Sequence, residues 1–232
     1  MIKGDIRKQQ ILDTAERFFT SKGFEATSVQ DILDEMNLSK GSFYHHYATK
    51  EEVLRRICEN RAEQTAPKPD ATDDAFPQDG LTRMNLFLHE MIPFHGEGMV
   101  FMKMVYPVFS NPVGKSVREG YVDALKKAWR PHIERALTDM VKEGSGYTSY
   151  PETTASIVMD LVNDLWQQLG DEIIGSIRDL DRQASPAKLL EMIEPYRHAL
   201  ENVMCAPYGS IVLLDLQDLI SAAETIQKWD KT

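Results

Sequence analysis

Residues 39–46, Ser-Lys-Gly-Ser-Phe-Tyr-His-His, gather hydrogen-bonding groups into one very short stretch. If the apolar Phe43 faces inward, a helical rotation of 100° per residue places Gly41 and His45 farthest from the interior. Such a face can hydrogen-bond to another molecule, and its glycine lets a backbone approach closely. A plain solvated face is the alternative. However, a helix of about two turns is too short to be stable for its own sake, so the stretch favours a binding surface.

Two short helices joined by residues 37–39 must position that face. The apolar stripe of residues 29–36 predicts the first helix, and Ser39 is expected to cap the second. Thr27, three residues before Gln30, has the spacing of a capping box for the first helix. Two short helices with a three-residue turn are typical of a helix-turn-helix, whose second helix enters the major groove of DNA.

The chain is expected to divide at a polar, proline-bearing stretch after residue 64. Residues 1–64 hold 10 basic and 11 acidic side chains, whereas the remainder holds 16 and 25, so the acidity lies downstream. We expect a DNA-binding domain over 1–64, with a connecting helix over 49–64, a linker over 65–78 and a larger domain over 79–232. No stretch alternates with period two, so the fold should be all-α.

Six helices are expected beyond the linker, and Pro131 should kink or divide the third of them. Ser185 followed by Pro186 is a strong start signal for the fifth. The expected ranges are about 79–92, 97–110, 113–143, 151–178, 186–203 and 209–229.

Composition and motifs exclude several classes of protein. No stretch of 18 residues lacks charges and breakers, so no membrane span is expected, and the two cysteines fit a reducing cytoplasm. P-loop, G-x-S-x-G, H-E-x-x-H and C-x-x-C motifs are missing from the sequence, so we expect neither an enzyme nor a cofactor. His89 and His95 fall on opposite sides of a helix interrupted by Pro93, so no metal site is expected.

The run from Thr27 to Leu54 resembles the tetracycline-repressor (TetR) family, and the resemblance extends over roughly residues 5–60. It includes the Ser-x-Gly of residues 39–41, the aromatic Tyr44 and the Lys-Glu pair of residues 50–51. Downstream, Gly-Ser-Gly-Tyr at 144–147, followed by a proline and a long helix, is similar to the lead-in to the family's dimerisation helices.

The resemblance implies an all-α protein with an N-terminal three-helix helix-turn-helix domain, joined to a larger helical ligand-binding and dimerisation domain. It also implies a homodimeric transcription factor, usually a repressor, that leaves double-stranded operator DNA when a small-molecule effector binds. By position, phosphates would be contacted by Thr27 or Ser28 and by Tyr44, and the free amides near Ser39 could bind phosphate too. Base edges would be approached by Lys40, Gly41, Ser42 and His45, and the DNA backbone would be held by His46 and Lys50.

Methionines and aromatic residues interleave over residues 84–109, where the family has its ligand domain. Because thioethers are flexible and polarizable, this composition favours a pocket for a mainly apolar effector over ordinary core. The residues expected to line it are Phe87, Met91, Phe94, His95, Met99, Met102 and Tyr106, with Met159 and Trp166 on the far wall.

The two segments 151–178 and 186–203 each carry a wide apolar stripe, and the family pairs such helices between subunits. We therefore expect a homodimer through these segments, although burial within one chain must account for part of each stripe. The role of the last helix stays open. The alternative function is a helix-turn-helix regulator that is controlled by a protein partner or acts without a small-molecule inducer.

Overall fold

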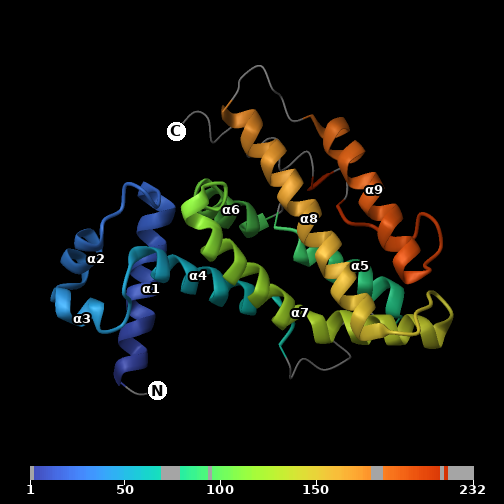
Figure 1. Ribbon diagram of the computed structural model, residues 1–232, viewed down its shortest axis with the longest axis horizontal. Helices are drawn as coiled ribbons and strands as arrows, with labels where there is room; N and C mark the ends of the chain where they lie inside the picture. The colour runs from blue at the N-terminus through green and yellow to red at the C-terminus, as the bar shows by residue number, and fades with distance from the viewer. Residues whose placement is uncertain (1–2, 69–78, 94–95, 179–184, 215–216, 219–232) are drawn as a thin grey trace. The chain divides into compact units, whose positions relative to one another are not determined.

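The computed structural model describes residues 3–68, 79–93, 96–178, 185–214 and 217–218 (Figure 1). These residues form helices joined by turns and contain no strand, which confirms the all-α prediction. None of the helices in the described ranges is long and apolar enough to cross a membrane. In chain order they are α1 (Lys3–Lys22), α2 (Val29–Met36), α3 (Lys40–Tyr44), α4 (Lys50–Thr65), α5 (Gly80–Met91), α6 (Gly96–Phe109), the short 3₁₀ turn η2 (Pro112–Gly114), α7 (Lys115–Glu143), α8 (Pro151–Arg178) and α9 (Pro186–Met204).

The chain forms two compact units, and α7 is continuous from one into the other. The first unit comprises residues 1–64 together with 100–125, and the second comprises 65–99 and 126–232. Pro131 does not divide α7, which contains it as an interior residue.

The core of the first unit contains the inward face of α1 that the sequence indicates. Ile11, Ala15 and Phe19 are buried there, and the ring of Phe19 meets that of Phe24 edge-on at 5.1 Å between centroids. Gly23, with φ of 87°, ends α1 in the left-handed region that favours glycine. The chain can therefore turn back toward α2, which packs against α1.

In the second unit, the start of α5 lies against the end of α7. A Cβ at Gly80 would lie 2.5 Å from the backbone nitrogen of Met140, so only glycine permits this approach. The Gly80 amide donates to the Glu143 carboxylate (2.8 Å), and the buried Arg83 pairs with Asp139 (2.7 Å). These contacts hold α5 against α7.

The helices α8 and α9 pack side by side as an antiparallel pair (Figure 1). Ser185 caps α9 by accepting from the Lys188 amide, and Pro186 follows it, as predicted. The buried Glu172 of α8 accepts from Lys188 at 2.7 Å. The start of α9 is thereby fixed to α8.

The helix predicted over 209–229 does not begin where the pattern places it. Residues 205–214, which we call the C-terminal strap, are not helical; the described residues beyond them are only Gln217 and Asp218, and 219–232 lie outside the described ranges. Ile211, Leu213 and Leu214 of the strap are buried. Asn85 of α5 donates to the Ser210 carbonyl (2.8 Å) and accepts from the Val212 amide (2.9 Å). Because a side chain satisfies its backbone, the strap can bury apolar residues without forming a helix.

Candidate nucleic-acid interface

The turn between α2 and α3 has the expected length and is closed by hydrogen bonds at both ends. Asn37 ends α2 in the left-handed region (φ 50°), and the amide of Leu38 donates to the Leu33 carbonyl at 2.9 Å. Ser39 then caps α3 by accepting from the Ser42 amide at 3.2 Å, as predicted. The local sequence thus dictates the angle at which α3 leaves the turn.

The cap of α2 is Ser28, and the prediction of Thr27 with Gln30 was wrong. Ser28 accepts from the amide of Asp31, whose carboxylate accepts from the Ser28 amide at 2.7 Å. The Ser28 amide, together with the Ser28 hydroxyl that donates to the same carboxylate, lowers the pKa of Asp31. Thr27 is buried, and its hydroxyl donates to the Gly23 carbonyl at 2.8 Å. Of the two residues expected near a phosphate, Ser28 is the exposed one.

The inward and outward faces of α3 fall where helical spacing predicts them. Phe43 is fully buried and Tyr47 is buried, with 6.3 Å between their ring centroids. Tyr44 is 54% exposed although its ring meets that of Phe43 edge-on. The remaining residues predicted on this surface are exposed or half-buried: Ser39, Lys40, Gly41, Ser42, His45 and His46.

Gly41 has no structural reason inside the protein to be glycine. A Cβ built on it meets no atom within 4 Å, and its φ is not in the left-handed region. Glycine costs roughly 0.5–1 kcal/mol relative to alanine within a helix. An open, solvent-facing glycine at this position is therefore suited to close approach by another molecule.

A cationic neighbourhood surrounds the two histidines. Their ring centroids lie 5.0 Å apart. Partial burial lowers the pKa of His46, and the nearby His45, Lys8 and Arg7 lower it further. Sequence reasoning did not single out Arg7, although it lies on the basic first half of α1. A phosphate placed here would be attracted by Lys8 and Arg7 and would favour the protonated imidazole.

The Lys50 side chain is held by hydrogen bonds to backbone carbonyls of the same domain. Its ammonium donates to the carbonyls of Phe24 (2.7 Å) and Thr27 (2.9 Å) and lies 4.1 Å from the centroid of the Phe24 ring. An ammonium has three donors, so one N–H remains beyond these two bonds. The side chain thus joins the start of α4 to the turn before α2.

We predict that Lys50→Met lowers the free energy of unfolding by about 1–3 kcal/mol, because two carbonyls lose their donor while the apolar stem is kept. Urea denaturation followed by circular dichroism measures the change. Lys40→Met is the matched control, since Lys40 is exposed and should leave stability unchanged. Equal stability of the Lys50 variant and the wild type would contradict this role.

The described residues that were predicted to line an apolar effector site are buried in the cores of the two units. All seven that the structure describes are buried, and Phe94 and His95 lie outside the described residues. The ring of Phe87, for example, meets Trp129 and His132 edge-on, with centroids 5.7 and 5.9 Å away. Met102 and Tyr106 belong to the first unit, whereas Phe87, Met91, Met99, Met159 and Trp166 belong to the second.

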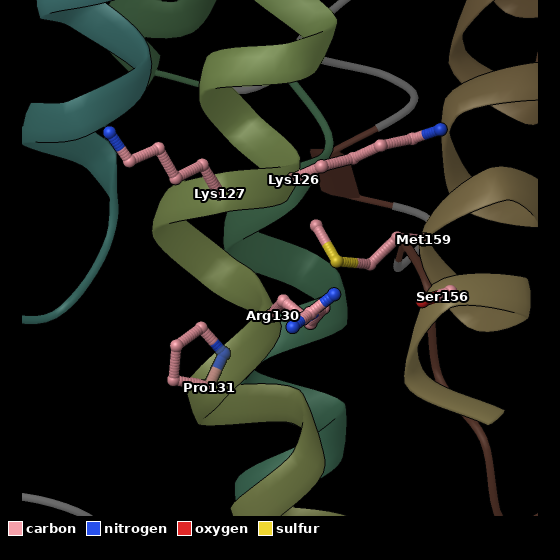
Figure 2. Close-up of a pocket in the computed structure, with 6 residues that line it drawn as sticks. All are labelled: Lys126, Lys127, Arg130, Pro131, Ser156 and Met159. Atoms are coloured by element: carbon pink, nitrogen blue, oxygen red, sulfur yellow. The ribbon is translucent and has the colours of Figure 1, made fainter. Parts of the chain in front are cut away.

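A pocket of about 440 Å³ lies between α7 and α8 in the second unit (Figure 2). Met159, one of the residues predicted to contact an effector, lines this pocket. The other lining residues are Lys126, Lys127, Arg130, Pro131 and Ser156. Its lining is thus richer in positive charge than the sequence indicates.

Comparison with protein families places the helix-turn-helix in a known group. Residues 11–57 match the family model described as bacterial regulatory proteins, tetR family. The HTH-type transcriptional regulator YuxN of Bacillus subtilis is 24% identical over 94% of this chain and 80% of its own length. The HTH-type transcriptional repressor KstR2 of Mycobacterium tuberculosis is 27% identical over 60% of this chain and 68% of its own length.

Further similarities include short sequence matches and a shared fold. Three further curated regulators match over 53 to 66 residues, which span 18 to 32% of their own lengths. The crystal structure of a TetR transcription regulator from Haloarcula marismortui superposes with a TM-score of 0.54 at 17% identity, covering 87% of this chain and 97% of that one. At that identity the likeness establishes the all-helical fold alone.

Proposed function

We propose that the chain is a homodimeric repressor of the TetR family of helix-turn-helix transcriptional regulators, released from operator DNA by a small, mainly apolar molecule. The family is one of regulators, not of enzymes. A repressor of this kind acts in the cytoplasm, where its operator lies. Its relative KstR2 is named a transcriptional repressor, which supports repression over activation for this chain.

The exposed face of α3 is the single observation that carries the DNA-binding role. The exposed surface of α3 consists of Gly41 and its hydrogen-bonding neighbours. The preceding turn and the buried Phe43 hold this helix in place. Lys40, Ser42 and His45 are proposed to approach base edges, and Tyr44 and Ser28 to contact phosphates. His46 lies beside Lys8 and Arg7, where a second stretch of phosphate backbone would be attracted. Lys50 would contribute its remaining N–H.

Gly41→Ala tests this role because its two expected effects have opposite signs. The methyl group meets open space in the free protein, so stability should rise by about 0.5–1 kcal/mol. Against DNA the same methyl would prevent close approach, and we expect affinity to fall at least about tenfold. Fluorescence anisotropy on a genomic fragment selected by the wild-type protein measures binding, and thermal melting measures stability. Unchanged DNA affinity in a stabilised variant would refute the proposed orientation of α3.

The proposed dimer uses what remains exposed of the apolar stripes on α8 and α9. Leu165, Leu169 and Leu200 are buried within the chain. Ile157 on α8 and Leu190 on α9 are exposed large apolar residues. Two copies of such a surface can cover each other by twofold symmetry, and a dimer would present two reading helices to two half-sites.

We expect the double substitution Ile157→Asp with Leu190→Asp to yield a folded monomer, because two carboxylates per subunit would have to be buried in the interface. Light scattering coupled to size exclusion measures the mass. DNA affinity should fall by more than about a hundredfold, since one short helix contacts too few bases. Val212→Asp, a change of an exposed apolar residue on the C-terminal strap, is the control. A dimer that persists in the double variant would place the interface elsewhere.

Release by a small molecule distinguishes this function from control by a protein partner. A compound that raises the melting temperature of the protein should also lower its affinity for the selected DNA fragment. Linkage then requires the DNA to weaken that compound's binding by the same factor. A protein that binds the fragment but responds only to another protein would support the alternative.

A further inference from the structure

The pocket between α7 and α8 has ionisable lining residues of a single sign. Lys126, Lys127 and Arg130 line it, and no acidic side chain is among its lining residues in the described part of the chain. At about 440 Å³ it lies within the range of small-molecule sites, which is roughly 300–1,000 Å³. Its chemistry therefore favours a ligand with a negative charge.

Two of the three cations are directed toward α8. Lys126 extends toward α8 and Arg130 pairs with Glu152 of α8, whereas Lys127 extends from the other side of α7 (Figure 2). Lys126 and Arg130 are four residues apart, so they share one face of the helix. An anionic group between α7 and α8 could contact both at once.

Each of these two cations has at least one partner acid that is largely exposed to solvent. Lys126 pairs with Asp160, and Arg130 pairs with Glu134 (3.1 Å) and with Glu152 (3.3 Å). The side chains of Asp160 and Glu152 are 61% and 73% exposed. Exposed ion pairs contribute little to stability, so a ligand can replace Asp160 and Glu152 at small cost while these two acids turn to water.

The remaining wall is apolar. Met159 is buried, and its flexible thioether points from α8 toward α7 (Figure 2). We propose that this pocket binds a small amphipathic anion, with its carboxylate or phosphate between Lys126 and Arg130 and its apolar body against Met159. The assignment rests on the proposed function for its regulatory meaning and names the chemical class of the effector.

The same helix offers a route by which the anion could act. Residues 115–125 of α7 belong to the first unit, where a Cβ at Gly120 would lie 3.3 Å from both Arg55 and Glu59 of α4. A shift of α7 at Lys126 would therefore displace the side chains at this tight contact with α4, because close-packed helices transmit displacement. The helix α4 directly follows the helix-turn-helix along the chain.

Isothermal titration of the full chain with decanoate, decyl phosphate, decanol and inorganic phosphate tests the assignment. Decanoate or decyl phosphate should bind at least about tenfold more tightly than decanol or inorganic phosphate, because each control probe lacks one half of the ligand. The ratio between the two amphiphiles distinguishes a carboxylate from a phosphate site.

Variants of the lining residues give the sharper result. Lys126→Gln with Arg130→Gln should weaken binding of the amphiphile at least about tenfold. Lys115→Gln, the same change at an exposed lysine of α7 that is not among the lining residues, should alter binding less than about twofold. Glu152→Gln with Asp160→Asn should strengthen binding about threefold, because it removes the exposed acid partner of each cation. This gain keeps the assignment testable if the first double variant fails to fold.

The assignment is overturned if decanol binds as well as decanoate, if neither amphiphile binds, or if Lys126→Gln with Arg130→Gln leaves the affinity unchanged. Anisotropy of the selected DNA fragment separates this failure from failure of the proposed function. An amphiphile that binds through these residues without releasing DNA would leave the site standing and refute the switch. A different compound that releases DNA independently of these residues would do the reverse.

Discussion

Replacing Phe43 with alanine is expected to lower the free energy of unfolding of the first unit by about 3–5 kcal/mol and to abolish DNA binding. Phe43 is fully buried, and its ring contacts those of Tyr44 and Tyr47. The five residues of α3 cannot form a stable helix alone, so this one side chain anchors the helix to the core. A typical domain has only about 5–15 kcal/mol of stability, so the loss is a large part of the total.

Hydrogen exchange of peptides covering residues 28–47 measures the effect locally, because α3 should lose its amide protection in the variant. Tyr44→Ala is the matched control, since it removes the adjacent aromatic ring from an exposed position. It should retain protection and still weaken DNA binding. If Phe43→Ala kept wild-type protection across this segment, the anchoring role of Phe43 would be disproved.

The faces of α3 could be predicted from the sequence because helical spacing alone decides them. Once Phe43 is placed inward, Tyr47 follows it into the core, and Gly41 and His45 must face out. The cap of α2 could not be predicted in the same way. Thr27 and Ser28 are both good capping residues, and in the structure the Thr27 hydroxyl donates to the Gly23 carbonyl, which leaves Ser28 as the cap.

The C-terminal strap shows where periodicity is misleading. Its run of apolar residues fits a helical stripe, yet Ile211, Leu213 and Leu214 are buried without a helix. The decisive group is Asn85, which lies 127 residues before Val212 in the chain and satisfies backbone groups of the strap. Local patterning cannot anticipate a hydrogen-bonding partner supplied by a distant helix.

The predicted ligand residues illustrate a further limit. Methionines and aromatic residues suit both an adaptable pocket and a close-packed core, and the sequence does not distinguish the two. In the structure those described are buried, whereas a pocket opens beside Lys126 and Arg130. Spacing would have placed these two cations on one helical face, but the helix opposite them becomes known only from the fold.

Replacing Glu201 with alanine is expected to lower the free energy of unfolding of the second unit by about 3–5 kcal/mol, because it leaves charged and polar groups without their partner. Glu201 is only 2% exposed. Its Oε1 accepts from Arg197 (2.7 Å) and from the Ile211 amide (3.3 Å), so it joins α9 to the C-terminal strap. Urea denaturation should show the loss, and hydrogen exchange should show exposure of residues 205–214.

Glu194 provides the matched control because it pairs with the same arginine. Arg197 donates to Glu194 at 2.6 and 2.9 Å, but the Glu194 side chain is 62% exposed, so Glu194→Ala should cost less than about 1 kcal/mol. A similar loss in both variants would mean that burial of Glu201 contributes nothing, and the link to the strap would then be wrong.

The pH dependence gives an independent test of the Glu201 contacts. Burial alone would raise the pKa of Glu201, but the Ile211 amide and the Arg197 guanidinium outweigh it and hold the pKa below its ordinary value. The folded carboxylate therefore binds a proton less readily than the unfolded one, so its contribution is present at neutral pH and declines as acid titrates it through the lowered pKa. The stability difference between wild type and Glu201→Gln should shrink over the same acidic range, whereas a constant difference would mean that the charge of Glu201 does not stabilise the strap.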